Sequence, residues 1–146
     1  MNYSVEIDIN RPINEVITLF IDSDNLLSWQ HNLLGVEVIN GEPGKVGTES
    51  RLLYNMGNKE VVMTEVITVN QLPDKYCAVY ETDNVWNLME NQFIDLGDDK
   101  TRWICKNEFK CSGFVRLMAM LMPSIFKKQS ERNQQQFKAF VESQSK

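Results

Sequence analysis

The residue best suited to acid–base chemistry in this sequence is Glu65, which lies within a predicted strand. A tight turn at Gly57-Asn58 joins this strand to the one before it, and such a turn fixes which residues stand opposite each other. The pairs expected on one face are Tyr54 with Val61, Leu52 with Met63, and Ser50 with Glu65. The other face of the first strand carries Glu49, Arg51 and Asn55, which suit solvent. Glu65 is therefore expected to point inward, where it needs a partner or a proton. A bulge that turns it outward is the alternative.

A second polar group, Asn107, is expected on the inner face of the last predicted strand. That face carries Trp103, Cys105, Asn107, Phe109 and Cys111. The turn at Gly97 to Lys100 leaves two registers open. An even turn places Glu90 opposite Asn107, whereas a three-residue turn with a bulge brings Met89, Asn91 and Phe93 inward. Either register leaves a polar side chain near Asn107, as in ligand pockets with a mostly apolar lining. A hydrogen-bonded pair inside a filled core is the alternative.

These patterns predict a mostly apolar binding site with three polar candidates. The expected ligand-binding residues are Leu52, Tyr54, Met63, Glu65, Trp103, Cys105, Asn107 and Phe109 on the strands, with Met118 and Met122 on the C-terminal helix. Methionine side chains adapt to irregular contents, and this chain has seven of them. If the site is catalytic, Glu65 or Glu90 is the acid–base group and Asn107 the partner of a carbonyl or oxyanion.

Other kinds of chemistry find little support in the sequence. His31 is the single histidine, and no cysteine or carboxylate lies near it at metal-ligand spacing, so we expect no metal and no cofactor. A catalytic triad could form only around that residue, which is more typical of a surface position. The segment GEPGKVG at 41–47 joins two strands and lacks the helix that a phosphate-binding loop requires. The three cysteines form no C-x-x-C pair and fit a reducing compartment.

Composition and charge indicate which kinds of molecule the protein is not expected to bind. The 146 residues carry a net charge of −5, so the surface as a whole repels phosphate and anionic lipid, and nucleic acid is not an expected partner. The N-terminal segment alternates like a strand and lacks the features of a signal peptide, which predicts a cytoplasmic protein. The longest apolar stretch, Phe114 to Met122, is interrupted by Arg116 and is too short to span a bilayer.

The periodicity predicts one α+β domain over residues 1–146 with the order β-α-α-β-β-β-β-β-β-α. A first strand over Tyr3 to Ile9 is followed by a helix to about Ile21 and a second helix that ends at Gly35. The remaining strands are expected at Val36–Asn40, Thr48–Met56, Lys59–Val69, Lys75–Thr82, Val85–Leu96 and Thr101–Cys111. Their short links force an antiparallel meander. The segment from Phe114 to about Ser143 is helical, with Pro123 expected to kink or split it. A curved sheet of about seven strands that wraps around this long helix is the simplest packing.

The whole chain resembles the SRPBCC superfamily of START-like, helix-grip proteins, and within it small polyketide-cyclase-like and CoxG-like members. The segments that carry the resemblance are Val5 to Pro12 followed by Glu15-Val16, Trp29, Val46-Gly47-Thr48, Thr101-Arg102-Trp103 and Gly113-Phe114. The resemblance implies a deep cavity between the sheet and the C-terminal helix that takes lipids, sterols or polyketides in various members. It supplies no catalytic motif that matches this chain residue for residue.

Three hypotheses for function follow. The first is a non-enzymatic binding or carrier protein for a small hydrophobic molecule, because acid–base groups are scarce. The second is a cyclase, dehydratase or hydrolase that acts on an aromatic or lipid-like substrate. The third is a protein-interaction module similar to the activator domain of Hsp90 co-chaperones, which would need an exposed apolar patch such as Phe114 to Met122. The sequence is compatible with a monomer or a homodimer.

Overall fold

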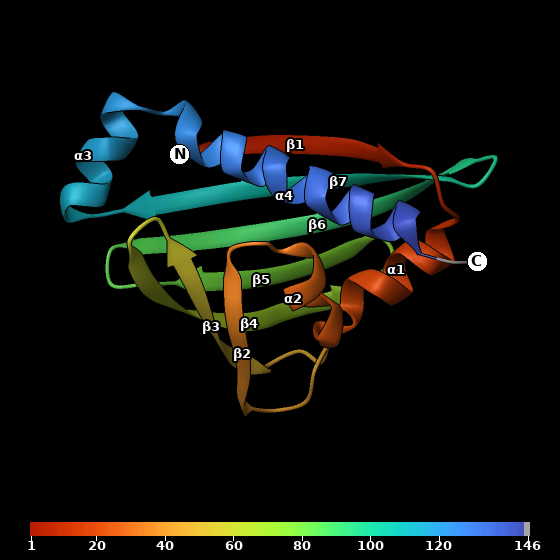
Figure 1. Cartoon of the computed structure of the whole chain (residues 1–146), viewed down its shortest axis with the longest axis horizontal. Coiled ribbons are helices and arrows are strands. Elements are labelled where there is room, and N and C mark those ends of the chain that lie inside the picture. Colours follow the sequence, from red (N-terminus) through yellow and green to blue (C-terminus); the bar gives the residue numbers. More distant parts are fainter. Residues whose placement is uncertain (145–146) are drawn as a thin grey trace.

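The computed structural model describes residues 1–144 and shows a seven-stranded antiparallel sheet whose concave face is crossed by a long helix (Figure 1). The strand order across the sheet is β1-β7-β6-β5-β4-β3-β2. The strands are β1 (Asn2–Ile9), β2 (Leu33–Asn40), β3 (Glu49–Met56), β4 (Lys59–Gln71), β5 (Lys75–Glu81), β6 (Val85–Gly97) and β7 (Lys100–Cys111). The helices are α1 (Ile13–Ile21), α2 (Leu26–Trp29), α3 (Gly113–Leu121) and α4 (Ser124–Ser143), with a 3₁₀ turn, η1, at Ser23–Asn25. The predicted helix-grip architecture is confirmed.

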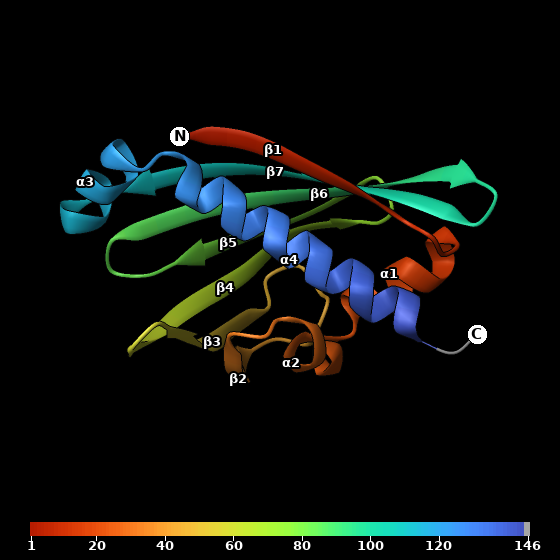
Figure 2. The same cartoon turned by 45° about the horizontal axis from the view of Figure 1, so that its top comes forward.

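Helix α4 is held against the sheet by the apolar residues of its C-terminal half. Figure 2 shows α4 running diagonally over the sheet, with α1 near its C-terminal end. Phe137 is completely buried and packs edge-to-face on Phe20, Trp29 and Trp103. Val141 is also completely buried one turn further on. This aromatic cluster fills the space between helix and sheet at one end of the molecule.

The hairpin between β3 and β4 has the register that the Gly57-Asn58 turn predicts. The observed partners are Tyr54 with Val61, Leu52 with Met63 and Ser50 with Glu65. Gly57 has a φ of 71°, a conformation that glycine adopts without strain. Glu65 therefore lies on the concave face, and β4 has no bulge in its pairing with β3.

The β6–β7 hairpin adopts the second of the two open registers, with Met89 opposite Asn107 and Phe93 opposite Trp103. The turn itself is even, because Gly97 pairs with Lys100. A bulge between Asp95 and Gly97 then shifts the register by one residue, which reverses the face of every residue before it. Glu90 is thus not a cavity residue. It lies opposite Lys106 on the convex face, and its carboxylate is 3.6 Å from Lys75 Nζ.

Two further expectations need correction. The second helix ends at Trp29 instead of Gly35, because the chain from Leu33 onward pairs with β3. Pro123 splits the C-terminal helix into α3 and α4, so α3 does not continue along the concave face. Met118 and Met122 are consequently solvent-exposed and do not form a wall of the cavity. Among the described residues, no helix combines the length and the hydrophobicity needed to cross a bilayer.

Replacing Phe137 with alanine tests the role of the aromatic cluster. We expect the free energy of unfolding to fall by about 3–5 kcal/mol, because a fully buried ring leaves a cavity that its neighbours cannot fill. Urea denaturation measures this loss, and the exposed position on the same helix, Gln135→Ala, serves as the control. A loss below about 1 kcal/mol for Phe137→Ala would show that the cluster does not hold α4 in place.

Candidate functional site

A cavity of about 1210 Å³ lies between the concave face of the sheet and the N-terminal half of α4. Its walls come from all seven strands, from the α1–α2 region and from helices α3 and α4. Its mouth lies between the tip of the β3–β4 hairpin, the β5–β6 turn and the start of α3, where the lining residues are exposed. Two more exposed lining residues, Val38 and Pro43, lie at the β2–β3 edge of the cavity.

The half of α4 that faces the cavity is mostly polar. Gln129, Ser130 and Asn133 line the cavity together with one aromatic residue, Phe126. The apolar residues Phe137 and Val141 lie in the filled core nearer the C-terminus. Gln134, which is buried between the two regions, donates to the backbone carbonyls of Val5 and Trp103 and so ties the helix to the sheet. The division of α4 into a polar and an apolar half explains why the cavity stays open beside a well-packed core.

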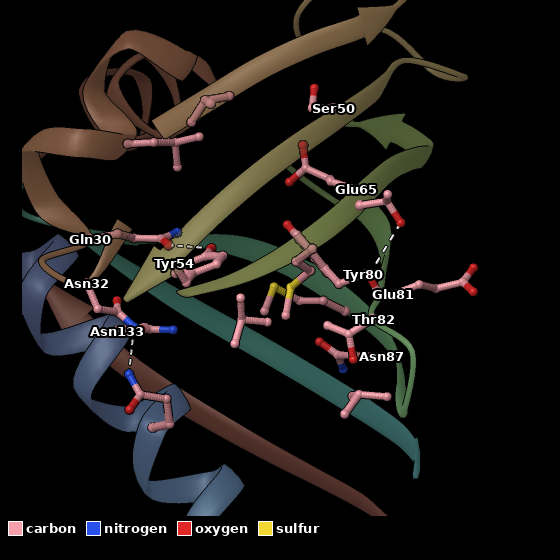
Figure 3. Close-up of a pocket in the computed structure, with 18 of the residues that line it drawn as sticks. Gln30, Asn32, Ser50, Tyr54, Glu65, Tyr80, Glu81, Thr82, Asn87 and Asn133 are labelled. Atoms are coloured by element: carbon pink, nitrogen blue, oxygen red, sulfur yellow. Dashed lines mark hydrogen bonds between the residues drawn. The ribbon is translucent and has the colours of Figure 1, made fainter. Parts of the chain in front are cut away.

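Glu65 belongs to a row of residues that crosses the floor of the cavity. The strand registers place Ser50, Glu65, Tyr80, Asn87 and Phe109 opposite one another in turn from β3 to β7. All five line the cavity. In Figure 3, Glu65, Tyr54 and Tyr80 project into the same space from three neighbouring strands. The carboxylate is thus surrounded by phenol side chains.

The surroundings of Glu65 change its proton affinity. Burial raises the pKa of Glu65 above its ordinary value of 4.5, and hydrogen bonding from the Tyr80 side chain opposes part of that rise. The pKa values of the neighbouring tyrosines are raised as well. Burial, together with the nearby Glu65 charge, raises the pKa values of Tyr54, Tyr76 and Tyr80. These tyrosines therefore remain neutral hydrogen-bonding groups throughout the physiological pH range.

Amide side chains form the rest of the polar lining. Asn87 Nδ2 donates to Asn107 Oδ1 at 3.2 Å, and Asn107 Nδ2 lies 3.3 Å from Cys105 Sγ. At the far wall, the Tyr54 hydroxyl donates to Gln30 Oε1 at 2.8 Å (Figure 3). Asn107 is therefore both a cavity residue and a member of a hydrogen-bonded pair.

One buried side-chain nitrogen or oxygen atom in residues 1–144 has no hydrogen-bond partner, the indole Nε1 of Trp29. Trp29 is 4% exposed and contributes to the lining of the cavity. A buried donor without an acceptor costs stability unless a ligand or a water supplies one.

Six of the ten predicted binding residues line the cavity, namely Tyr54, Met63, Glu65, Trp103, Asn107 and Phe109. Leu52 and Cys105 are buried but are not part of the lining, and Cys105 belongs to the hydrophobic core. Met118 and Met122 lie on the outside. Glu65 and Asn107 are separated by two intervening strands, about 14 Å along the sheet, and make no contact with each other.

The sequence reasoning missed Tyr76, Tyr80 and Asn87, and it missed the polar half of α4. The inward orientation of the two tyrosines could have been predicted from the alternation of residues along their strand. In the segment Lys75 to Thr82 they share a parity with Ala78, whereas the other parity carries Lys75 and Glu81, which suit solvent. A bulge between Ile67 and Val69 then sets Tyr80 opposite Glu65, which the sequence does not reveal.

The chain has the fold of START-like, helix-grip proteins. A START superfamily protein from Mycobacterium smegmatis superposes with a TM-score of 0.78 at 13% identity, over 97% of both chains. The ZhuI aromatase/cyclase of Streptomyces sp. R1128 gives 0.81 at 11% identity, over 97% of this chain and 93% of that one. Norcoclaurine synthase from Thalictrum flavum gives 0.74 at 14% identity, over 100% and 89%. No family model and no curated protein sequence matches the chain.

The raised pKa of Glu65 predicts how stability depends on pH. Between pH 4.5 and the folded-state pKa, the native protein keeps a proton that the unfolded chain has lost, so stability falls as pH rises. Glu65→Gln removes this dependence. The stability of the variant relative to the parent should therefore grow as pH rises above about 4.5, measured by urea unfolding from acid to neutral pH. Glu60→Gln, at an exposed position on the same strand, serves as the control. A flat difference for Glu65→Gln would show that this carboxylate is not buried.

Proposed function

We propose that the protein binds and carries a small, largely apolar molecule in the cavity between the sheet and α4. The observation that carries the proposal is a space of about 1210 Å³ in a molecule whose core is otherwise tightly packed. Protein interiors rarely contain voids much larger than a water molecule, and ligand pockets commonly measure ~300–1,000 Å³. A cavity of this size is suited to a molecule as large as a lipid, a polyketide or a several-ring aromatic compound.

The lining suggests how such a ligand is oriented. Apolar side chains such as Val61, Met63, Ile67 and Met89 cover the sheet side, and they suit a hydrophobic body. The hydrogen-bonding groups are gathered at Glu65 with its tyrosines and along the first turns of α4. A ligand with an apolar body and a polar group fits this division, because each part finds a matching surface.

The geometry favours binding over acid–base catalysis. Glu90 lies on the convex face, and Glu65 and Asn107 stand three strands apart along the sheet. A general acid or base and an oxyanion partner must both reach one reacting group. The fold itself is shared with a START superfamily protein and with an aromatase/cyclase, so it does not decide between the two roles.

Filling the cavity tests the proposal. Met89→Trp adds an indole to the cavity wall, whereas Leu88→Trp adds the same group to the other face of the same strand. Native mass spectrometry after gentle purification should find an apolar adduct on the parent and on Leu88→Trp. Met89→Trp should lose it, and should bind the uncharged fluorophore N-phenyl-1-naphthylamine at least about tenfold more weakly because a large side chain occupies the site. A parent protein with neither adduct nor fluorophore binding would contradict the proposed function.

A further inference from the structure

The polar end of the cavity holds a partly buried carboxylate without a counter-charge. Glu65 forms no salt bridge with any residue of the described chain. The lining contains a single cation, Lys59, which is exposed at the tip of the β3–β4 hairpin. Three other carboxylates, Glu60, Glu81 and Asp83, stand at the mouth. The cavity is therefore acidic at its opening and at its polar end.

The groups that face Glu65 are aromatic and neutral. Strand β3 contributes Tyr54 and Ser50, and β5 contributes Tyr76 and Tyr80. Helices α2 and α4 and the α2–β2 link bring only uncharged side chains into the cavity, among them Gln30 and Asn133. Aromatic faces attract cations, and a desolvated carboxylate is stabilised by one. What this end of the site lacks is a positive charge.

We propose that the ligand carries a cationic amine, which pairs with Glu65 inside the ring of tyrosines. The proposal rests on the carrier function above and names the chemical class of its ligand. An ammonium group would supply the missing counter-charge, and the acidic mouth would raise its local concentration. A carboxylate ligand would instead meet like charge at both ends of the cavity.

Three molecules with the same ten-carbon chain distinguish a cationic, a neutral and an anionic head group. They are decylamine, 1-decanol and decanoic acid. Each is titrated against protein loaded with N-phenyl-1-naphthylamine. Decylamine should displace the fluorophore with an affinity at least about tenfold higher than that of decanol, because a charge-assisted bond replaces a neutral one. Decanoic acid should bind more weakly than decanol. The affinity for decylamine should rise with pH as Glu65 loses its proton, and that for decanol should not.

Matched variants locate the effect. Glu65→Gln should abolish the preference for decylamine while leaving the affinity for decanol within about twofold. The control Glu131→Gln, at an exposed position on α4 outside the cavity lining, should keep the preference. Equal affinity of the parent for amine and alcohol would overturn the amine proposal and leave the carrier function intact. If the parent binds neither the fluorophore nor any of the three molecules, the carrier function itself fails.

An independent feature lies beside the mouth of the cavity. The α3 patch consists of the exposed apolar side chains Phe114, Leu117, Met118, Met120, Leu121, Met122 and Ile125, which are between 36% and 73% exposed. Helix α3 projects beyond the end of the sheet (Figure 1), and Ala119 is its one buried residue. Contiguous apolar surface of this kind marks an interaction site.

The charge around the α3 patch is opposite to that of the chain. Residues 112–130 include Arg116, Lys127 and Lys128 and no aspartate or glutamate, in a protein with a net charge of −5. The geometry points to docking of the α3 patch on a bilayer that contains anionic lipid. Its apolar side chains would enter the interface while the cations meet the headgroups. A second copy is a poorer occupant, because a two-fold interface brings the same cations toward each other.

Vesicle co-sedimentation tests this docking with phosphatidylcholine vesicles, with and without phosphatidylglycerol. The parent should bind the anionic vesicles, and added salt should weaken the binding. The double variant Met120→Ser/Leu121→Ser should bind about tenfold more weakly, since it removes two exposed apolar side chains. The control Leu34→Ser/Val46→Ser changes two exposed apolar residues elsewhere and should bind like the parent. No binding to anionic vesicles, or a dimer that the α3 variant dissolves, would overturn the proposal.

Discussion

The contact between the C-terminal half of α4 and the sheet determines where the helix lies and therefore where the cavity forms. Phe137 packs on Phe20, Trp29 and Trp103, and this cluster fixes the helix across the concave face. The N-terminal half of the same helix presents Gln129, Ser130 and Asn133, which do not pack into an apolar core. One end of the molecule is thus a filled core that anchors the helix, and the other is a cavity that the helix covers without filling.

The cavity in turn explains the unusual position of Glu65. The register of the β3–β4 hairpin directs this side chain inward, and the neighbouring strand surrounds it with tyrosines. A carboxylate that is partly withdrawn from water and has no cation beside it lowers stability, and proteins keep such groups mainly at functional sites. Interpreting the group as a recognition element for a ligand accounts for its burial, for its neutral neighbours and for the acidic mouth of the cavity.

Much of this arrangement was predictable from local patterns. Period-two alternation and short turns give the antiparallel sheet. The Gly57-Asn58 turn puts Glu65, Tyr54 and Met63 on one face, and the charged residues of the other face identify it as the concave one. Two features were not predictable in this way. The bulge before Gly97 decides whether Glu90 or Asn91 faces inward, and its placement depends on packing of Phe93 and Trp103 in the core. The exposure of α3 depends on the angle between α3 and α4 at the break around Pro123, which apolar periodicity does not specify.

A crystal structure of the protein as purified, without any step that extracts lipids, tests most directly whether the cavity is a binding site. Continuous density along the apolar wall, with one end within about 3 Å of the Glu65 carboxylate, is the predicted result. A cavity closed by its own side chains, with α4 lowered onto the sheet and Glu65 turned to solvent, would contradict it.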